Sequence, residues 1–174
     1  MPLSLHEAFV PGALQMLGTA AALIGKAEDW CAEAGCDPAE MIGARIHPGM
    51  FPYSYQVKSV AVHTAGAIAG VRAGVFSPDL APPPEDFAGL RAVIADAREA
   101  LEAVTPDEME GFIGQPMRFE FGATTLPFTA QDFLLSFSQP NFYFHAATAY
   151  DILRMKGVAV GKRDFMGRLR LAPR

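Results

Sequence analysis

The chain has 174 residues, a length typical of one domain with a sizeable buried core. Its hydrophobic share of 51% is slightly above the usual value, and its charged share of 19% is below it. A net charge of −5 argues against nucleic-acid binding, which normally requires a basic surface. The apolar excess indicates much buried surface, and we expect part of it to form a homodimer interface.

Several signals that would place the chain in a membrane or give it a known chemistry are missing. The first residues show no cationic start before an apolar run, so no signal peptide is indicated. No stretch of about 18 apolar residues runs without polar interruption, so we expect a cytoplasmic protein without a membrane span. Cys31 and Cys36 lack the spacing of a redox pair or a zinc knuckle. No glycine-rich phosphate loop, HExxH motif or nucleophile elbow occurs.

Helical signals begin near the N-terminus. Ser4, with Glu7 three residues later, forms a capping box for a long helix that we expect over residues 4–34. An aspartate cap followed by a first-turn proline predicts a short helix over residues 37–43.

The middle of the chain predicts two further long helices. Residues 52–73 form one of them, and their many alanines and glycines would let a neighbouring helix approach closely. The proline-rich connection at residues 77–86 is too rigid for a helix and too short to divide domains. Residues 86–104 then carry one apolar stripe at helical spacing, and residues 105–108 cap a short helical turn.

The last third of the chain combines extended and helical signals. Residues 116–128 alternate apolar and polar side chains before a turn at Gly122, which predicts a β-hairpin of two short strands. Residues 129–157 form the longest apolar-rich segment, and Pro140 in its middle predicts a kink or two abutting helices. We expect residues 158–174 to form a solvated tail.

These elements predict a mainly all-α protein that forms a single domain over residues 1–174. Four long helices in up-down order would make a four-helix bundle, with a long connection between the second and third helices. The small β-hairpin would be inserted before the last long helix.

One polar pair lies among aromatic residues in the last helix. Asn141 and His145 are four residues apart and share one helical face, with Thr148 close by. Histidine commonly serves as a metal ligand or as a base. The alternative is structural: a buried imidazole bonded to Asn141, Thr148 or the second helix. In that case the Asn141 side chain would satisfy carbonyls that the kink at Pro140 frees.

Three stretches of the sequence resemble the DUF1993 family: MFP-x-x-x-QV at Met50–Val57, FTAQDFLL at Phe128–Leu135, and PNFYFHAATAYDILRMKGVAVGKRDFMG at Pro140–Gly167. That family is grouped with the DinB/YfiT-like metalloenzymes, and the resemblance extends over nearly the whole chain. It implies a DinB-like up-down four-helix bundle that is usually a dimer. In the wider superfamily three histidines hold a divalent metal, one on the second long helix and two at HxxxH spacing on the last.

The sequence departs from this histidine pattern. His145 occupies the position of the second histidine on the last helix, but Asn141 stands in place of the first. On the second helix the resemblance points to His63, with Gln56 seven residues earlier on the same face. Two imidazoles with amide oxygens form a poor zinc site, and nickel or iron would need favourable geometry.

Three functions are compatible with these residues. The first is a metal-dependent transferase or hydrolase-type enzyme, with His63 and His145 as ligands of Zn, Ni or Fe. The second is a protein that binds a small molecule in a core cavity. The candidate ligand-binding residues are Gln56, Asn141, His145 and Thr148. The third is a non-catalytic structural or stress-associated dimer. The incomplete histidine set favours the second function over the first and leaves open whether the protein is an enzyme.

Overall fold

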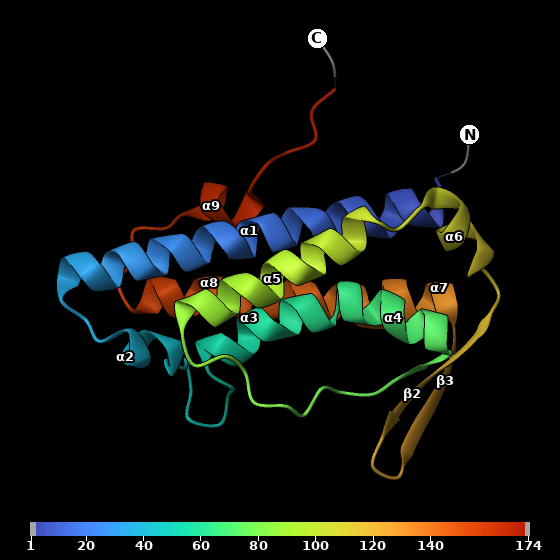
Figure 1. The fold of residues 1–174 in the computed structure, drawn as a ribbon, viewed down its shortest axis with the longest axis horizontal. Coiled ribbons are helices and arrows are strands. Elements are labelled where there is room, and N and C mark those ends of the chain that lie inside the picture. Colours follow the sequence, from blue (N-terminus) through green and yellow to red (C-terminus); the bar gives the residue numbers. More distant parts are fainter. Residues whose placement is uncertain (1–2, 173–174) are drawn as a thin grey trace.

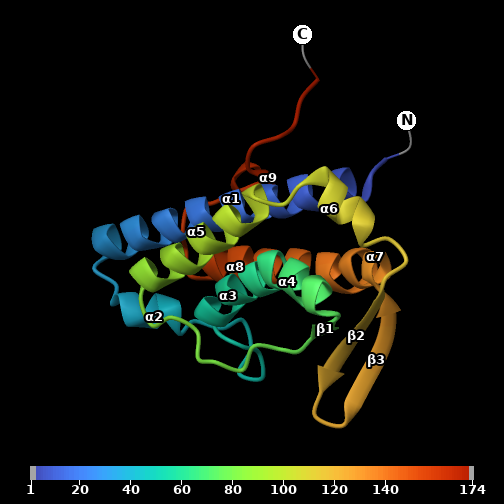
Figure 2. The same ribbon diagram turned by 45° about the vertical axis from the view of Figure 1, so that its right-hand side comes forward.

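The computed structural model describes residues 3–172 and shows a mostly helical protein with a small three-stranded sheet (Figure 1). The helices are α1 (Leu5–Ala34), α2 (Pro38–Ile42), α3 (Tyr53–Val62), α4 (Ala65–Ala73), α5 (Phe87–Glu102), α6 (Pro106–Gly111), α7 (Ala130–Asp132), the π-helix η1 (Phe133–Ser138), α8 (Gln139–Met155) and α9 (Lys162–Met166). The strands are β1 (Val75–Phe76), β2 (Pro116–Phe121) and β3 (Thr124–Thr129). Figure 2 shows the sheet extending from the end of the molecule where α4 and α7 lie.

The predicted first helix is confirmed as α1. Ser4 Oγ accepts a hydrogen bond from the Glu7 N–H, and the Glu7 carboxylate accepts one from the Ser4 N–H. Gly35 ends the helix in the left-handed conformation, with φ 65°. Within residues 3–172, α1 is the one helix long and apolar enough to cross a membrane, yet 56% of its most apolar window is buried inside the molecule. We therefore assign it as a core helix.

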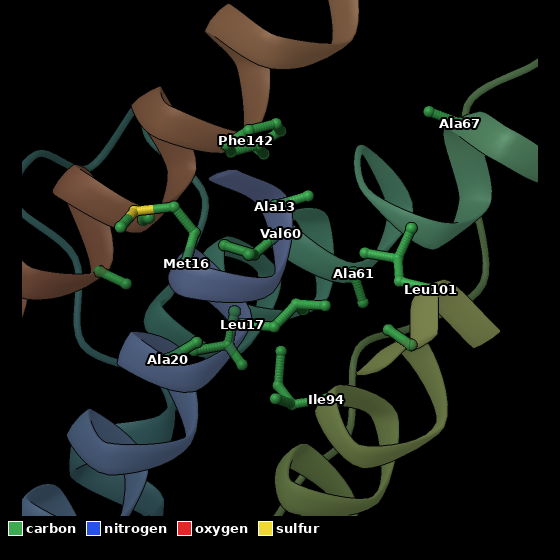
Figure 3. Packing of buried hydrophobic residues seen from close by; sticks show 14 of the residues in the cluster. Ala13, Met16, Leu17, Ala20, Val60, Ala61, Ala67, Ile94, Leu101 and Phe142 are labelled. Atoms are coloured by element: carbon green, nitrogen blue, oxygen red, sulfur yellow. The ribbon is translucent and has the colours of Figure 1, made fainter. Parts of the chain in front are cut away.

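Most of the helices contribute side chains to one core, and Figure 3 shows part of it, where apolar residues of α1, α3, α5 and α8 face one another. The labelled residues are Ala13, Met16, Leu17 and Ala20 of α1, Val60 and Ala61 of α3, Ala67 of α4, Ile94 and Leu101 of α5, and Phe142 of α8. Burial of a large apolar side chain stabilises a fold by about 1.5–3 kcal/mol. This core therefore fixes α3 and α8, the helices that carry the predicted site residues, relative to each other.

The second long helix is divided in two, so the prediction of one unbroken helix was wrong. α3 ends at Val62, Thr64 has non-helical backbone angles (φ −107°, ψ −87°), and α4 begins at Ala65. The buried Thr64 Oγ1 donates to the Val60 carbonyl at 2.7 Å. A hydroxyl that bonds a helix carbonyl competes with the backbone for it and favours such irregularities. The break places His63 at the end of α3.

The predicted hairpin is confirmed, and a third strand that the sequence did not predict joins it. β2 and β3 pair antiparallel over their whole length. β1 pairs with β2 in parallel, with Val75 opposite Arg118 and Phe76 opposite Phe119. A strand of two residues carries no recognisable alternation. The buried Phe76 side chain links the sheet to the helices.

The irregularity predicted near Pro140 takes the form of the π-helix η1. At its end the Gln139 N–H donates to the Leu134 carbonyl, five residues back. Pro140 has no N–H and cannot make the regular helical bond to residue 136. The wider turn therefore lies directly before the helix that carries the predicted site residues.

The solvated tail predicted for residues 158–174 is wrong over its first half, because Val158 and Val160 are buried and Lys162–Met166 form α9, which packs on α1. Gln15 Nε2 donates to the Met166 carbonyl at 2.6 Å, and Thr19 Oγ1 donates to the Phe165 carbonyl at 3.0 Å. Figure 1 shows α9 lying along the outer side of α1.

Candidate functional site

A cavity of about 210 Å³ lies between α3, the segment after β1, β2 and the helix formed by η1 and α8. Its lining residues are Tyr55, Lys58, Ser59, Val62, His63, Phe76, Pro78, Asp79, Phe119, Phe137, Asn141 and His145. Three of the residues predicted from the sequence, His63, Asn141 and His145, therefore meet at one place.

His63 follows the last residue of α3 and has a largely buried ring. Its Nδ1 atom is buried and has no hydrogen-bond partner within residues 3–172. Burial, together with the neighbouring His145, lowers the pKa of His63 to about 4, so the ring is neutral at pH 7. An unpaired buried N–H is rarer in proteins than an unpaired acceptor, so we assign the ring proton to Nε2. His63 then offers an N–H donor to the cavity.

His145 has the opposite arrangement of ring nitrogens. Its Nδ1 atom lies 2.7 Å from Gln56 Oε1. The Gln56 amide nitrogen donates to the Phe51 carbonyl at 3.0 Å, which fixes its oxygen toward His145. His145 Nδ1 must then carry the proton, and Nε2 keeps its lone pair. Burial lowers the pKa of His145 to about 4, so this ring is neutral as well.

The rings of His63 and His145, which we call the histidine pair, lie next to each other. Their centroids are 5.7 Å apart and their planes differ by 13°. With the protons assigned as above, the pair presents one hydrogen-bond donor and one acceptor. Neither Nε2 atom has a hydrogen-bond partner within residues 3–172.

The two other residues predicted on the last helix make bonds within that helix. Asn141 lines the cavity, and its Nδ2 donates to the Phe137 carbonyl at 2.7 Å. Thr148 Oγ1 donates to the Phe144 carbonyl at 2.8 Å, and Thr148 does not line the cavity. Gln56 also lies outside the lining and acts on the cavity through His145.

Aromatic rings form much of the cavity wall. The Phe137 ring, carried by η1, lies 5.0 Å from the Phe119 ring of β2 and 5.9 Å from the His63 ring. Phe76 of β1 lies 5.5 Å from the same imidazole. The strand β1 and the π-helix, neither of which the sequence predicts, therefore supply two of these three phenylalanine rings, and the predicted strand β2 supplies the other.

An ion pair that the sequence did not predict lies at the cavity wall. Lys58 of α3 is only 7% exposed, and its Nζ donates to the Ala81 carbonyl at 2.5 Å and bonds Asp79 Oδ2 at 2.8 Å. This bond is the main reason that the pKa of Asp79 is lowered. Lys58 is the one Lys, Arg, Asp or Glu between Pro52 and Arg72. A single charged residue in an otherwise uncharged helix could have indicated this ion pair from the sequence.

The donor set does not fit the metal centre that the family resemblance implies. Within residues 3–172 no three His, Cys, Asp or Glu side chains lie together. Asn141 occupies the position of the third histidine and donates to a carbonyl, while Gln56 Oε1 already accepts from His145. The histidine pair supplies two imidazole ligands, whereas zinc sites in proteins normally use three or four protein ligands. The predicted metal ligands therefore come together, but as an incomplete set.

A family model described as a domain of unknown function, DUF1993, matches residues 5–166. The chain belongs to the DUF1993 family. The match includes every residue that lines the cavity. A search of curated proteins found no match to this DUF1993 protein.

A solved structure of a DinB family member protein from Shewanella denitrificans is similar to this DUF1993 protein. The two sequences are 25% identical, and the alignment covers 97% of this chain and 96% of the other. The TM-score of 0.80 confirms the relation to the DinB fold that the sequence predicts.

Proposed function

We propose that this DUF1993 protein binds a small molecule at the histidine pair through a neutral group of about one ring that carries a hydroxyl or a carboxamide. The observation that carries the proposal is a cavity with three phenylalanine rings in its wall and with two imidazole Nε2 atoms that have no hydrogen-bond partner among residues 3–172. Ligand sites of this kind combine apolar walls with a few convergent polar groups.

The head group follows from the two ring nitrogens. A hydroxyl can donate to Nε2 of His145 and accept from Nε2–H of His63. A carboxamide presents an N–H and a carbonyl side by side and can do the same. The charges at the wall, Lys58 and Asp79, neutralise each other. A charged head group would lose water without gaining an opposite charge, which is costly.

The size of the ligand follows from the cavity volume. An apolar cavity of about 150 Å³ can hold benzene. A cavity of about 210 Å³ therefore has room for one ring with a small substituent. The rings of Phe76, Phe119 and Phe137 provide the apolar contacts for it.

The acid–base properties of the histidine pair favour binding over catalysis. A general base works best when its pKa lies near the operating pH. The pKa values of His63 and His145 are lowered to about 4, so both rings are weak bases. A metal-dependent mechanism would need a third strong ligand, and within residues 3–172 no third His, Cys, Asp or Glu side chain is grouped with the histidine pair; Asp79, which also lines the cavity, is bonded to Lys58.

The overall architecture supports such a site between helices. When α3 and α4 are taken as one bent helix, they form with α1, α5 and α8 what we infer to be a DinB-type four-helix bundle. The homodimer stays a prediction. The exposed aromatic side chains of Tyr143 and Phe144 on α8 support an interface there.

Calorimetric titration with p-cresol and p-xylene tests the proposal. The two molecules have nearly the same shape, but p-xylene lacks the hydroxyl. We expect p-cresol to bind at least about tenfold more tightly, because p-xylene leaves both Nε2 atoms without partners. Equal affinity for the two molecules, or no binding of p-cresol, would contradict the proposal.

Two alanine variants locate the binding. His63→Ala and His145→Ala should each remove most of the preference for p-cresol. His6→Ala, which removes a histidine that lies outside the cavity lining, is the matched control and should leave the preference unchanged. The comparison of the two molecules on the wild-type protein does not depend on the stability of any variant.

A further inference from the structure

A second cavity of about 350 Å³ lies next to the first and shares two wall residues with it, Tyr55 and Asp79. It is lined by the loop before α3 and by the proline-rich segment after β1. We propose that the two cavities form one elongated site for an amphipathic monocarboxylate, with the polar head at the histidine pair and the carboxylate at Arg45. This inference rests on the proposed function, because the head group must bind in the first cavity.

Arg45 is the cation that the second cavity contributes. Four other arginines, at positions 72, 91, 98 and 118, each pair with a glutamate. Arg45 has no carboxylate partner within residues 3–172 and makes one hydrogen bond, from Nη1 to the Met50 carbonyl at 3.3 Å. A guanidinium has five N–H donors in a planar fork that matches a carboxylate. Most of its donors are therefore free for a ligand.

An aromatic surface leads from Arg45 toward the first cavity. The rings of Phe51 and Tyr55 stack with centroids 4.0 Å apart and planes 20° apart. Phe51 is 59% exposed although it lies in this stack. The Tyr55 ring contacts the His145 ring edge-on, with centroids 6.1 Å apart. An apolar body that lies along Phe51 and Tyr55 would join a head group at the histidine pair to a carboxylate at Arg45.

The charges at the shared wall favour one negative charge on the ligand. Asp79 lies at the boundary of the two cavities, but its carboxylate is bonded to Lys58 Nζ at 2.8 Å. The pair is neutral as a whole, so the charged residues that line the two cavities sum to one positive charge, that of Arg45. A monoanion balances this charge, whereas a dianion would exceed it.

The alternative is that Arg45 only supports its own loop. Its bond to Met50 closes a loop of residues that precedes α3. That bond is long and uses one of five donors, and it does not account for the exposed Phe51 ring above the cavity. If Arg45 only supports the loop, a negative charge on the ligand should not change the affinity. If Arg45 binds a carboxylate, the negative charge should increase it.

The test uses para-hydroxyphenyl alkanoates with chains of about one to five methylene groups, each compared with its primary amide by calorimetry. The phenol head reports on the first cavity and the carboxylate on Arg45. For the wild-type protein we expect the carboxylate to bind about tenfold more tightly than the amide at one optimal chain length, and similarly to it at the shortest. Arg45→Gln should reduce this ratio to about one, chiefly by weakening the binding of the carboxylate.

The control variant is Arg168→Gln, which removes an arginine from a different cavity, formed by α1 and the C-terminal segment. It should keep the tenfold ratio, and this excludes an effect of net charge alone. If the amides bind but the carboxylates have no advantage at any length, the elongated site is wrong and the proposed function stands. If neither the amides nor the carboxylates bind, both proposals are wrong.

Discussion

Burial is the main reason that His63 and His145 are neutral. Each ring has lost most of its water, and neither has a carboxylate that would stabilise a positive charge. His145 obtains one hydrogen bond from Gln56, whereas His63 has none at Nδ1. A neutral pair of this kind is suited to a ligand that donates one hydrogen bond and accepts another.

The lowered pKa values predict a stability that depends on pH. In the unfolded chain both rings titrate near 6.5, and in the folded protein near 4. Between these values the unfolded chain binds more protons, so the free energy of unfolding is largest above pH 6.5 and falls toward pH 4. The slope is about 1.4 kcal/mol per pH unit for each histidine.

Urea unfolding at several pH values measures this slope for the wild-type protein and for the His63→Gln variant. The slope for the variant should be smaller by the contribution of one histidine, about 1.4 kcal/mol per pH unit. Its other titrating groups are unchanged, so they cancel in the comparison. The same slope in both proteins would contradict the assignment of His63 as a buried neutral ring.

We expect Asn141 to limit metal binding in the cavity. It lines the cavity with both histidines, at the position where the family resemblance implies a third imidazole. The Asn141→His variant would complete a set of three histidines, the number found in many zinc sites. We expect the variant, but not the wild type, to contain about one equivalent of zinc after purification, measured by elemental analysis. Equal metal content in the two proteins would show that residue 141 is not what limits metal binding.

Lys58 and Asp79 differ in burial, and this predicts different costs when each is replaced. Lys58→Met leaves Asp79, whose side chain is 44% exposed, to be solvated by water, so we expect a loss of about 1 kcal/mol or less. Asp79→Asn leaves the buried ammonium of Lys58 without its carboxylate and should cost about 2 kcal/mol or more. Chemical denaturation measures both values, and a reversed order would contradict the described burial of the pair.

At the scale of elements, capping signals were the most informative part of the sequence. The Ser4 box defined the start of α1, and Thr129 caps the last long helix through a bond from the Asp132 N–H. The break at Thr64 was not predictable, because a threonine in a helix has more than one bonding choice and the packing of α3 and α4 selects one. The two residues of β1 are defined by their partner strand rather than by their own sequence.

Two glycine substitutions on or near α1 should change the stability in opposite directions, and the first of them depends on the docking of α9. Gly167 has φ 59°, and a Cβ added there would lie 2.6 Å from Thr19 Oγ1. Gly167→Ala should therefore lower the free energy of unfolding by about 1 kcal/mol or more. Gly18 lies inside α1 with no atom within 4 Å of an added Cβ, so Gly18→Ala should raise it by about 0.5–1 kcal/mol. Urea unfolding distinguishes the two, and a neutral Gly167→Ala would contradict the docking of α9.

At the scale of the whole molecule, the sequence was sufficient for the family and for a mostly helical, DinB-like fold. Long motifs near its middle and end indicated DUF1993 and a DinB-like structure, and both are confirmed. The sequence also indicated His63 and His145, whose ring centroids lie 5.7 Å apart in the fold. It could not show the cavity, because the aromatic wall and the Lys58–Asp79 pair come from segments far apart in the chain whose meeting depends on β1 and η1.

A long-range proton–nitrogen NMR spectrum of the histidine rings at pH 7 tests the donor and acceptor roles of the histidine pair most directly. We predict that His145 carries its proton on Nδ1 and His63 on Nε2, and that both Nε2 signals shift when p-cresol is added. A proton on Nε2 of His145, or Nε2 signals that p-cresol leaves unchanged, would contradict the proposed binding site.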